Sequence, residues 1–169
     1  SMSIGIHNLG RILRRLEDDR HPEELYRLAI RLGSKLGIPG LLADMEHDLT
    51  ELLLEQHRLD EADAVFREAQ ALAVSVTGNY LGGNDVRFNL SVLGVRLRYA
   101  QGYLTQSQAV AEFEGLLSIW VSPEQQAELH WRAWQIDSSL ESHRLAAAKQ
   151  FYALATTTSA ILFRQRYHE

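Results

Sequence analysis

A helix-pair pattern occurs twice in this chain, and the two copies are offset by 40 residues. Six positions match in size or polarity: Leu9, Gly10, Leu13, Tyr26, Ala29 and Leu32 correspond to Leu49, Thr50, Leu53, Phe66, Ala69 and Leu72. A fixed period is typical of stacked helical units, because one unit cannot bury its apolar face alone and its neighbour completes the burial. The period therefore constrains the architecture of the chain much more than its chemistry.

Apolar residues recur at helical spacing along the chain, and no segment shows the alternation of a half-buried strand. We expect helices over residues 3–16, 22–33, 41–55, 60–72, 85–100, 105–121, 123–136 and 142–155. Asp60 and Ser122 are the expected N-caps of two of them, since their side-chain oxygens can accept hydrogen bonds from the first helical turn. These features predict an all-α fold class.

The second helix pair resembles the tetratricopeptide (TPR) repeat, which alternates small and large residues at fixed spacing. The residues that carry the resemblance are Leu49, Thr50, Leu53, Ala62, Phe66 and Ala69. Small residues let the helices approach closely and large ones fill the space between them. Similar positions follow in the third and fourth pairs: Leu93, Gly94, Leu97, Ala109, Phe113 and Leu116, then Ala147, Phe151 and Leu154.

The resemblance implies an α–α superhelix of about four TPR-like helix pairs, an α-solenoid in one domain over residues 2–169. The repeats are expected at about 3–37, 41–76, 85–121 and 123–155, with a capping segment over 156–169. Ser1 is interpreted as a remnant of cloning. The long repeats and the alanine-rich end are similar to the TPR arrays of bacterial signalling and regulatory proteins, so we expect a protein-interaction module of that kind.

In the TPR family, inward-facing positions of each first helix line a concave groove that binds a peptide or a partner domain. Carried onto this chain, the resemblance implies a groove lined by His7, Arg11, Arg14, Arg15, His47, Glu51, Phe88, Arg98 and Tyr99. A second interpretation stays open, because charged residues on a helix face are explained equally well by solvation.

Composition excludes several other classes of protein. No apolar run approaches the roughly 18 residues of a bilayer-spanning helix, so no membrane partner is expected. The formal net charge of −5 argues against a general nucleic-acid binder. Cysteine is absent, which removes disulfides and thiolate metal sites and fits an expected cytoplasmic location.

The tryptophans gather in the last third of the chain, where Trp120, Trp131 and Trp134 lie near Phe151 and Tyr152 in the sequence. Packing between the final helices is one interpretation. The alternative is a self-associating structural spacer that dimerises through this Trp-rich end. A small-molecule sensor with a pocket in the concave face is a third hypothesis.

No segment carries an enzyme motif. Glu46, His47 and Asp48 could suggest metal ligands, but adjacent residues on a helix point in different directions. The carboxylates near Arg58 (Asp60, Glu61 and Asp63) are read as helix-start residues. The glycines of residues 78–83 lack the strand and the lysine–serine pair of a phosphate-binding loop. The prediction is therefore no catalysis, no cofactor and no metal.

Overall fold

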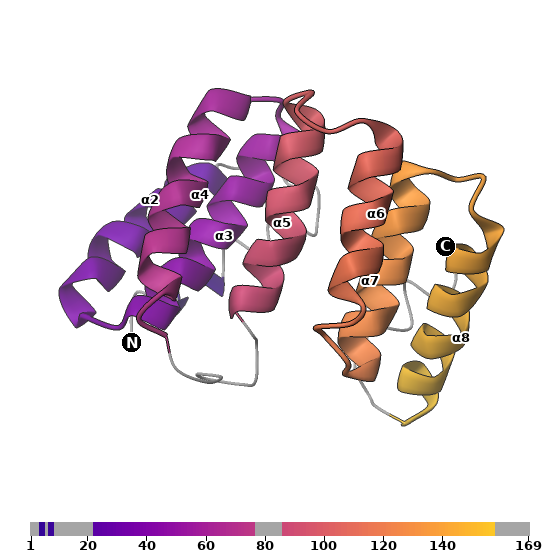
Figure 1. The fold of residues 1–169 in the computed structure, drawn as a ribbon. Helices are drawn as coiled ribbons and strands as arrows, with labels where there is room; N and C mark the ends of the chain where they lie inside the picture. The colour runs from indigo at the N-terminus through magenta and orange to yellow at the C-terminus, as the bar shows by residue number, and fades with distance from the viewer. Residues whose placement is uncertain (1–3, 6, 9–21, 77–85, 158–169) are drawn as a thin grey trace. The chain divides into compact units, whose positions relative to one another are not determined.

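The computed structural model describes residues 4–5, 7–8, 22–76 and 86–157, and its regular structure is helical (Figure 1). Its elements are α2 (Pro22–Gly33), the short 3-10 helix η1 (Ser34–Leu36), α3 (Pro39–Glu55), α4 (Leu59–Ala73), α5 (Val86–Ala100), α6 (Gln106–Leu116), α7 (Pro123–Ile136) and α8 (Glu141–Thr157). No strand occurs within these described ranges, so the predicted all-α class is confirmed.

The chain divides into two compact units, Ser1–Ala100 and Gln101–Glu169. The predicted third repeat, 85–121, therefore has its first helix in one unit and its second helix in the other. None of the helices in the described ranges combines the length and the apolarity of a bilayer span.

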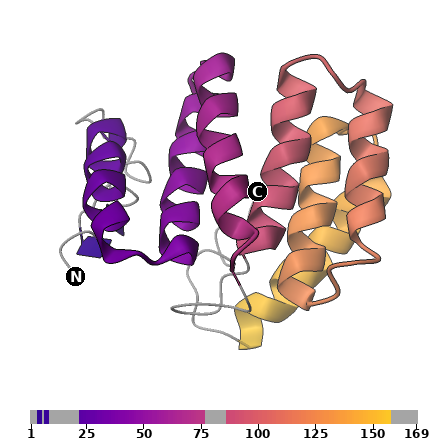
Figure 2. The ribbon, with the colours of Figure 1, turned by 60° about the vertical axis from the view of Figure 1, so that its left-hand side comes forward.

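Helix α3 is the centre of the first unit, since it packs against α2, α4 and α5. A connection of three residues folds α4 back along α3, and the two helices run side by side in Figures 1 and 2. The helices share a hydrophobic core whose fully buried members include Tyr26, Leu49, Leu53 and Leu93. Five described residues of the 40-residue pattern thus belong to the core of this unit: Tyr26, Leu49, Leu53, Phe66 and Ala69.

The small residues of the pattern lie where helices meet. Thr50, Ala62 and Ala69 have no exposed surface. A β-carbon placed on Gly94 of α5 would lie 3.0 Å from the ring of Phe66 on α4. In this unit the small residues therefore lie at close helix contacts and the large ones fill the space between helices, as the sequence pattern predicts.

The second unit contains α6, α7 and α8, with α7 packed against both of the others. Its core includes Ala127, Ala147, Phe151 and Leu154. The half-buried Trp131 packs against that cluster, which confirms the packing interpretation for this residue. Trp120 and Trp134 are also half-buried, whereas the side chain of Tyr152 is exposed.

Two helices of the second unit begin with reciprocal capping boxes. The hydroxyls of Thr105 and Ser122 accept from the backbone N–H groups of Gln108 and Gln125, whose side chains accept in return from the N-cap N–H groups. The predicted Ser122 cap is confirmed. The predicted Asp60 cap is wrong: the N–H of Ala62 bonds the carbonyl of Arg58 at 2.9 Å, so α4 starts at Leu59 and Asp60 lies in its first turn.

Helix α6 ends at Leu116, whereas the sequence pattern predicts an end near Val121. The residues after Leu116 form turns instead. The side-chain amide of Gln126 donates to the carbonyls of Leu117 and Trp120 at 2.8 Å each, which satisfies backbone acceptors that a longer helix would bond internally.

Candidate functional site

One side of α3 carries a chain of polar side chains centred on Asp48. Its carboxylate lies 2.9 Å from Nε2 of His7 through Oδ2 and 3.2 Å from Nδ1 of His47 through Oδ1. His7 and Asp48 are buried, at 2% and 7% exposure. His7 and His47 are 40 positions apart, which equals the period of the helix-pair pattern. One carboxylate thus contacts two histidines that the predicted pattern places at equivalent positions.

The same side of α3 is joined to α5 by an ion pair. Arg96 of α5 donates to Oε1 of Glu51 at 2.5 Å, and both side chains are less than one-fifth exposed. Glu51 lies one helical turn after His47, so the histidine, the aspartate and this ion pair form a continuous polar surface. This surface, made of His7, His47, Asp48, Glu51 and Arg96, is called the α3 polar face below.

The charges of this face favour a protonated His47. Burial by itself would lower the pKa of His47, but the hydrogen bond to Asp48 and the negative charges of Glu51 and Asp44 outweigh it. The pKa of His47 is therefore raised above its usual value.

Three side chains of α3 lie close enough together to be considered as metal ligands. One ligand atom each from His47, Asp48 and Glu51 lie within 4.8 Å of one another, so adjacent residues of α3 do converge here, against the expectation from helix geometry. Each group is nevertheless bonded to a protein partner. A cation at this place would have to displace Arg96 from Glu51 and separate His47 from Asp48, so we assign no metal site.

The structure brings together three residues of the predicted groove, His7, His47 and Glu51. On α5, Phe88 is buried and Tyr99 is half-buried. Arg98 is exposed, and its Nε donates to the carbonyl of Gly94, on the side of α5 that meets α4. The predicted Arg11, Arg14 and Arg15 lie outside the described residues.

Two members of the α3 polar face are absent from the predicted groove, Asp48 and Arg96. The 40-residue offset between His7 and His47 is a sequence signal for Asp48, because an acidic residue that lies beside both histidines would bond them both. No sequence signal points to Arg96, because the groove positions of the TPR family fall on Arg98 instead.

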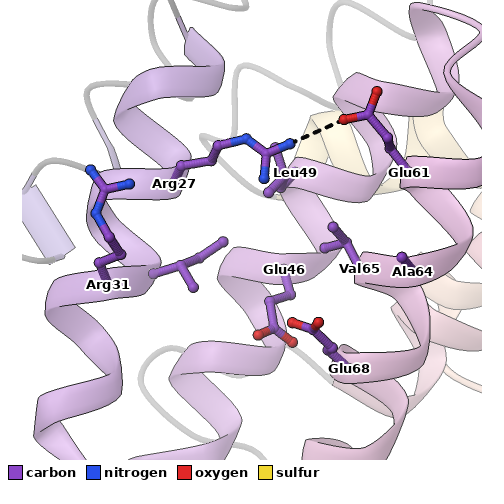
Figure 3. Close-up of a pocket in the computed structure, with 9 residues that line it drawn as sticks. Arg27, Arg31, Glu46, Leu49, Glu61, Ala64, Val65 and Glu68 are labelled. Atoms are coloured by element: carbon purple, nitrogen blue, oxygen red, sulfur yellow. Dashed lines mark ion pairs between the residues drawn. The ribbon is translucent and has the colours of Figure 1, made fainter.

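A pocket of about 360 Å³ lies among α2, α3 and α4, on another side of α3 (Figure 3). Its lining residues are Arg27, Ile30, Arg31, Glu46, Leu49, Glu61, Ala64, Val65 and Glu68. Figure 3 shows the carboxylates of Glu46 and Glu68 facing each other across it. The pocket therefore combines apolar walls with a pair of like charges.

Glu46 is unusual for a carboxylate, since it is only 5% exposed. Its Oε2 atom is buried and has no hydrogen-bond partner among the described residues. Burial and the nearby charge of Glu68 raise the pKa of Glu46 to about 7. Buried polar atoms without partners are rare in folded proteins, so this atom requires an explanation.

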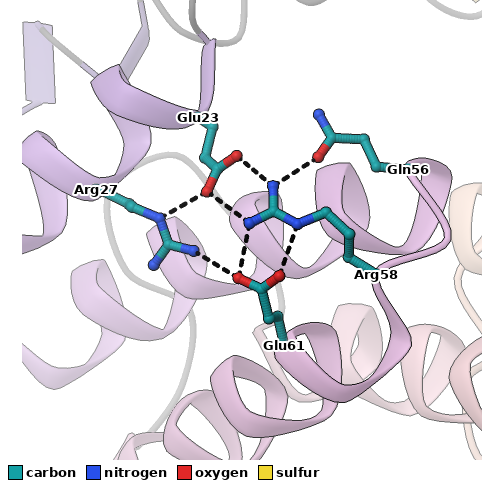
Figure 4. A network of polar contacts seen from close by, with 5 residues as sticks. All are labelled: Glu23, Arg27, Gln56, Arg58 and Glu61. Atoms are coloured by element: carbon teal, nitrogen blue, oxygen red, sulfur yellow. Dashed lines mark hydrogen bonds and ion pairs between the residues drawn. The ribbon is translucent and has the colours of Figure 1, made fainter.

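At one end of the pocket, Arg27 and Glu61 take part in a network of ion pairs around Arg58 (Figure 4). Arg58 donates to Glu23 at 2.5 and 3.2 Å and to Glu61 at 2.7 Å, and it holds the pKa of both carboxyls below the usual value. Arg27 bonds Glu23 at 2.8 Å and lies 3.5 Å from Glu61. This network ties α2 to the start of α4 and leaves Glu46 and Glu68 outside it.

Comparisons of this chain with protein families, with curated proteins and with solved structures found no match. The similarity to TPR repeats therefore depends on the residue pattern and on the packing described above.

Proposed function

We propose that this chain is a protein-interaction module, a TPR-like superhelix of helix pairs that binds a peptide or a partner domain within a bacterial signalling or regulatory protein. The observation that carries the proposal is the packing of α3 against both α4 and α5. In a helix-pair superhelix, the first helices of successive pairs lie side by side and form one wall of a groove.

The chemistry of the α3 polar face supports a binding role better than a catalytic one. Asp48 and Glu51 are each bonded to basic side chains, so the charges are fixed in position by their neighbours. Polar groups that are fixed in position suit recognition of a polar or charged segment, because little side-chain entropy is lost on binding. The half-buried ring of Tyr99, on α5, adds apolar surface of the kind found at interface hot spots.

The test is a selection of peptides from a displayed library against the full chain, followed by affinity measurements with single variants. Tyr99→Ala should weaken binding of the selected peptides about tenfold, the loss typical of a hot-spot aromatic. The matched control is Tyr103→Ala, which removes a 74% exposed tyrosine outside the first unit. Equal affinities for the wild type and Tyr99→Ala would contradict the proposed surface.

A second candidate function is self-association through the second unit. Large apolar side chains are exposed there to more than half of their surface: Tyr103, Ile119, Val121, Leu145 and Tyr152. Leu145 and Tyr152 are seven residues apart and so share one side of α8. Light scattering of the wild type and of a Leu145→Ser, Tyr152→Ser variant tests this role. A wild-type monomer at high concentration would exclude it.

A further inference from the structure

The pocket among α2, α3 and α4 has an unbalanced set of charges. Its three carboxylates are Glu46, Glu61 and Glu68, and its two cations are Arg27 and Arg31. Glu61 and Arg27 belong to the Arg58 network, so they already have partners. The buried Oε2 atom of Glu46 has no hydrogen-bond partner among the described residues, the exposed carboxylate of Glu68 faces Glu46, and Arg31 points away from both in Figure 3.

An unpaired acidic group at this depth is costly to the fold. A buried polar atom without a partner typically costs about 1–3 kcal/mol, and a charged one costs more. Two carboxylates facing each other add repulsion between like charges. A ligand that supplies a positive charge and hydrogen-bond donors would remove both penalties at once.

We propose that this pocket binds an organic cation, a guanidinium or primary ammonium group on an aliphatic stem, held between Glu46 and Glu68. The walls fit the stem, because Ile30, Leu49 and Val65 present apolar surface that methylene groups can cover. A guanidinium matches the two facing carboxylates with planar, paired donors. The volume lies within the usual range of small-ligand sites.

The apolar walls distinguish an organic cation from a divalent metal ion. Calcium prefers about six to eight oxygen ligands and magnesium about six, several of them water molecules. Here Glu46 and Glu68 face each other, the third carboxylate, Glu61, is bonded to Arg58, and the other neighbours are aliphatic side chains and arginines. Arg27 and Arg31 would repel a doubly charged ion, whereas a single delocalised charge can lie against Glu46 and Glu68 at a distance from them.

This site is separate from the α3 polar face and does not depend on the interaction function proposed above. The cation can come from the side chain of a protein or from a free amino acid. Arg31 distinguishes these sources, because it is exposed at the pocket without a described partner and can bind the carboxylate of a free amino acid. A peptide-bonded arginine has no such carboxylate.

Occupancy should depend on pH through Glu46. Arg27 and Arg31 line the same pocket from α2, and Glu61 and Glu68 line it from α4. A cation binds the ionised form of Glu46, whose pKa is about 7. The ionised fraction rises about tenfold between pH 6 and pH 8 for such a group. Because guanidinium stays charged over this range, its affinity should rise with pH by about the same factor.

The test is an NMR titration of the full chain with N-acetyl-arginine amide, observed at the methyl groups of Ile30, Leu49 and Val65. We expect these signals to shift with arginine and to remain in place with N-acetyl-citrulline amide, which has the same shape without the charge. Equal shifts with citrulline, or no shift with arginine, would overturn the proposal. Tighter binding of magnesium or calcium at the same signals would overturn it in favour of an inorganic cation.

Variants locate the binding groups. Glu46→Gln and Glu68→Gln should each weaken arginine binding about tenfold, the loss expected when one ionic partner is removed. Glu55→Gln, at the exposed end of α3, is the matched control and should bind like the wild type. An unchanged affinity for Glu46→Gln would overturn the assignment, and its methyl spectrum shows directly that it is folded.

Two further measurements distinguish a free amino acid from a peptide side chain as the ligand, and this pocket from the α3 polar face. If free arginine binds more tightly than the blocked form and Arg31→Ala abolishes that preference, the ligand is a free amino acid. If free arginine binds no more tightly than the blocked form and Arg31→Ala changes neither affinity, the ligand is a peptide side chain. Tyr99→Ala should leave the titration unchanged, so failure of the peptide-binding proposal and failure of this site are distinguishable.

Discussion

Gly94 of α5 lies directly against the ring of Phe66 on α4, so closely that an added β-carbon would be 3.0 Å from Cζ of the ring. These residues lie on neighbouring helices, and they occupy a small and a large position of the predicted pattern. The contact shows why the pattern needs a small residue here: the two helices meet at a point that has no room for a side chain.

Gly94→Val should destabilise the first unit by about 2 kcal/mol, because the new side chain must displace the Phe66 ring from its packed position. Urea denaturation measures the loss. The control is Gly115→Ala in α6, where no atom lies within 4 Å of the added carbon. Since alanine favours a helix by about 0.5–1 kcal/mol over glycine, this control should not be destabilised. Similar stabilities for Gly94→Val and the wild type would contradict the close packing.

Glu46→Gln should stabilise the protein at pH 8 by about 1–3 kcal/mol. Folding raises the pKa of Glu46 from 4.5 to about 7, so the native state disfavours the ionised form. The resulting penalty is absent below pH 4.5, develops as the pH rises, and is complete above pH 7. Thermal denaturation from pH 4 to pH 8 should therefore show the two proteins diverging with increasing pH. Parallel curves would mean that Glu46 is not the group responsible.

The second unit should lose stability on acidification through His130, which lies against His143. Their Nδ1 atoms lie 2.8 Å apart, which requires one nitrogen to accept, and Nε2 of His143 lies 3.2 Å from Glu114. Burial, and then the neighbouring His143, lower the pKa of His130 below 6.5. The unfolded chain therefore binds the proton more readily, and stability should fall as the pH drops below about 6.5.

His130→Gln should reduce this acid dependence in a pH series of thermal denaturation, since it removes the titrating group. His57→Asn is the control: His57 is exposed, and asparagine tolerates its φ of 58°. An acid dependence that persists in His130→Gln would locate its cause elsewhere in the chain.

Ser122→Ala should destabilise the start of α7 by about 1 kcal/mol, because the hydroxyl accepts from the N–H of Gln125. The measurement is hydrogen exchange of the first turn of α7, together with the free energy of unfolding. Ser118→Ala is the comparison, since that hydroxyl only donates to the carbonyl of Gly115 in an exposed turn. Equal protection in both variants would show that the capping box contributes little.

The helices could largely be predicted from the sequence, because local signals determine them. Ser122 and Pro123 mark the start of α7, and helical spacing of apolar residues gives α3, α5 and α8 to within about two residues. The errors arise where backbone groups find other partners. The carbonyl of Arg58 starts α4 ahead of Asp60, and Gln126 satisfies carbonyls after the end of α6.

The polar sites could be predicted only in part, because they depend on contacts between distant segments. Residue types and the family pattern led to His47 and Glu51, but the partners Asp48 and Arg96 follow from tertiary packing. The pocket could not be predicted at all. Glu46 reads as an ordinary charged helix residue, and its burial depends on how α2 and α4 cover α3.

The side chain of Thr50 has no exposed surface, yet its hydroxyl donates to the carbonyl of Glu46 in its own helix at 2.7 Å. Because the hydroxyl is hydrogen-bonded within its own helix, it needs no partner on a neighbouring helix. Only the volume of the side chain then affects how the helices pack. Serine or alanine at this point should therefore replace threonine at modest cost. The first unit can therefore keep its architecture when the residue type at this position changes, as long as the new side chain is small.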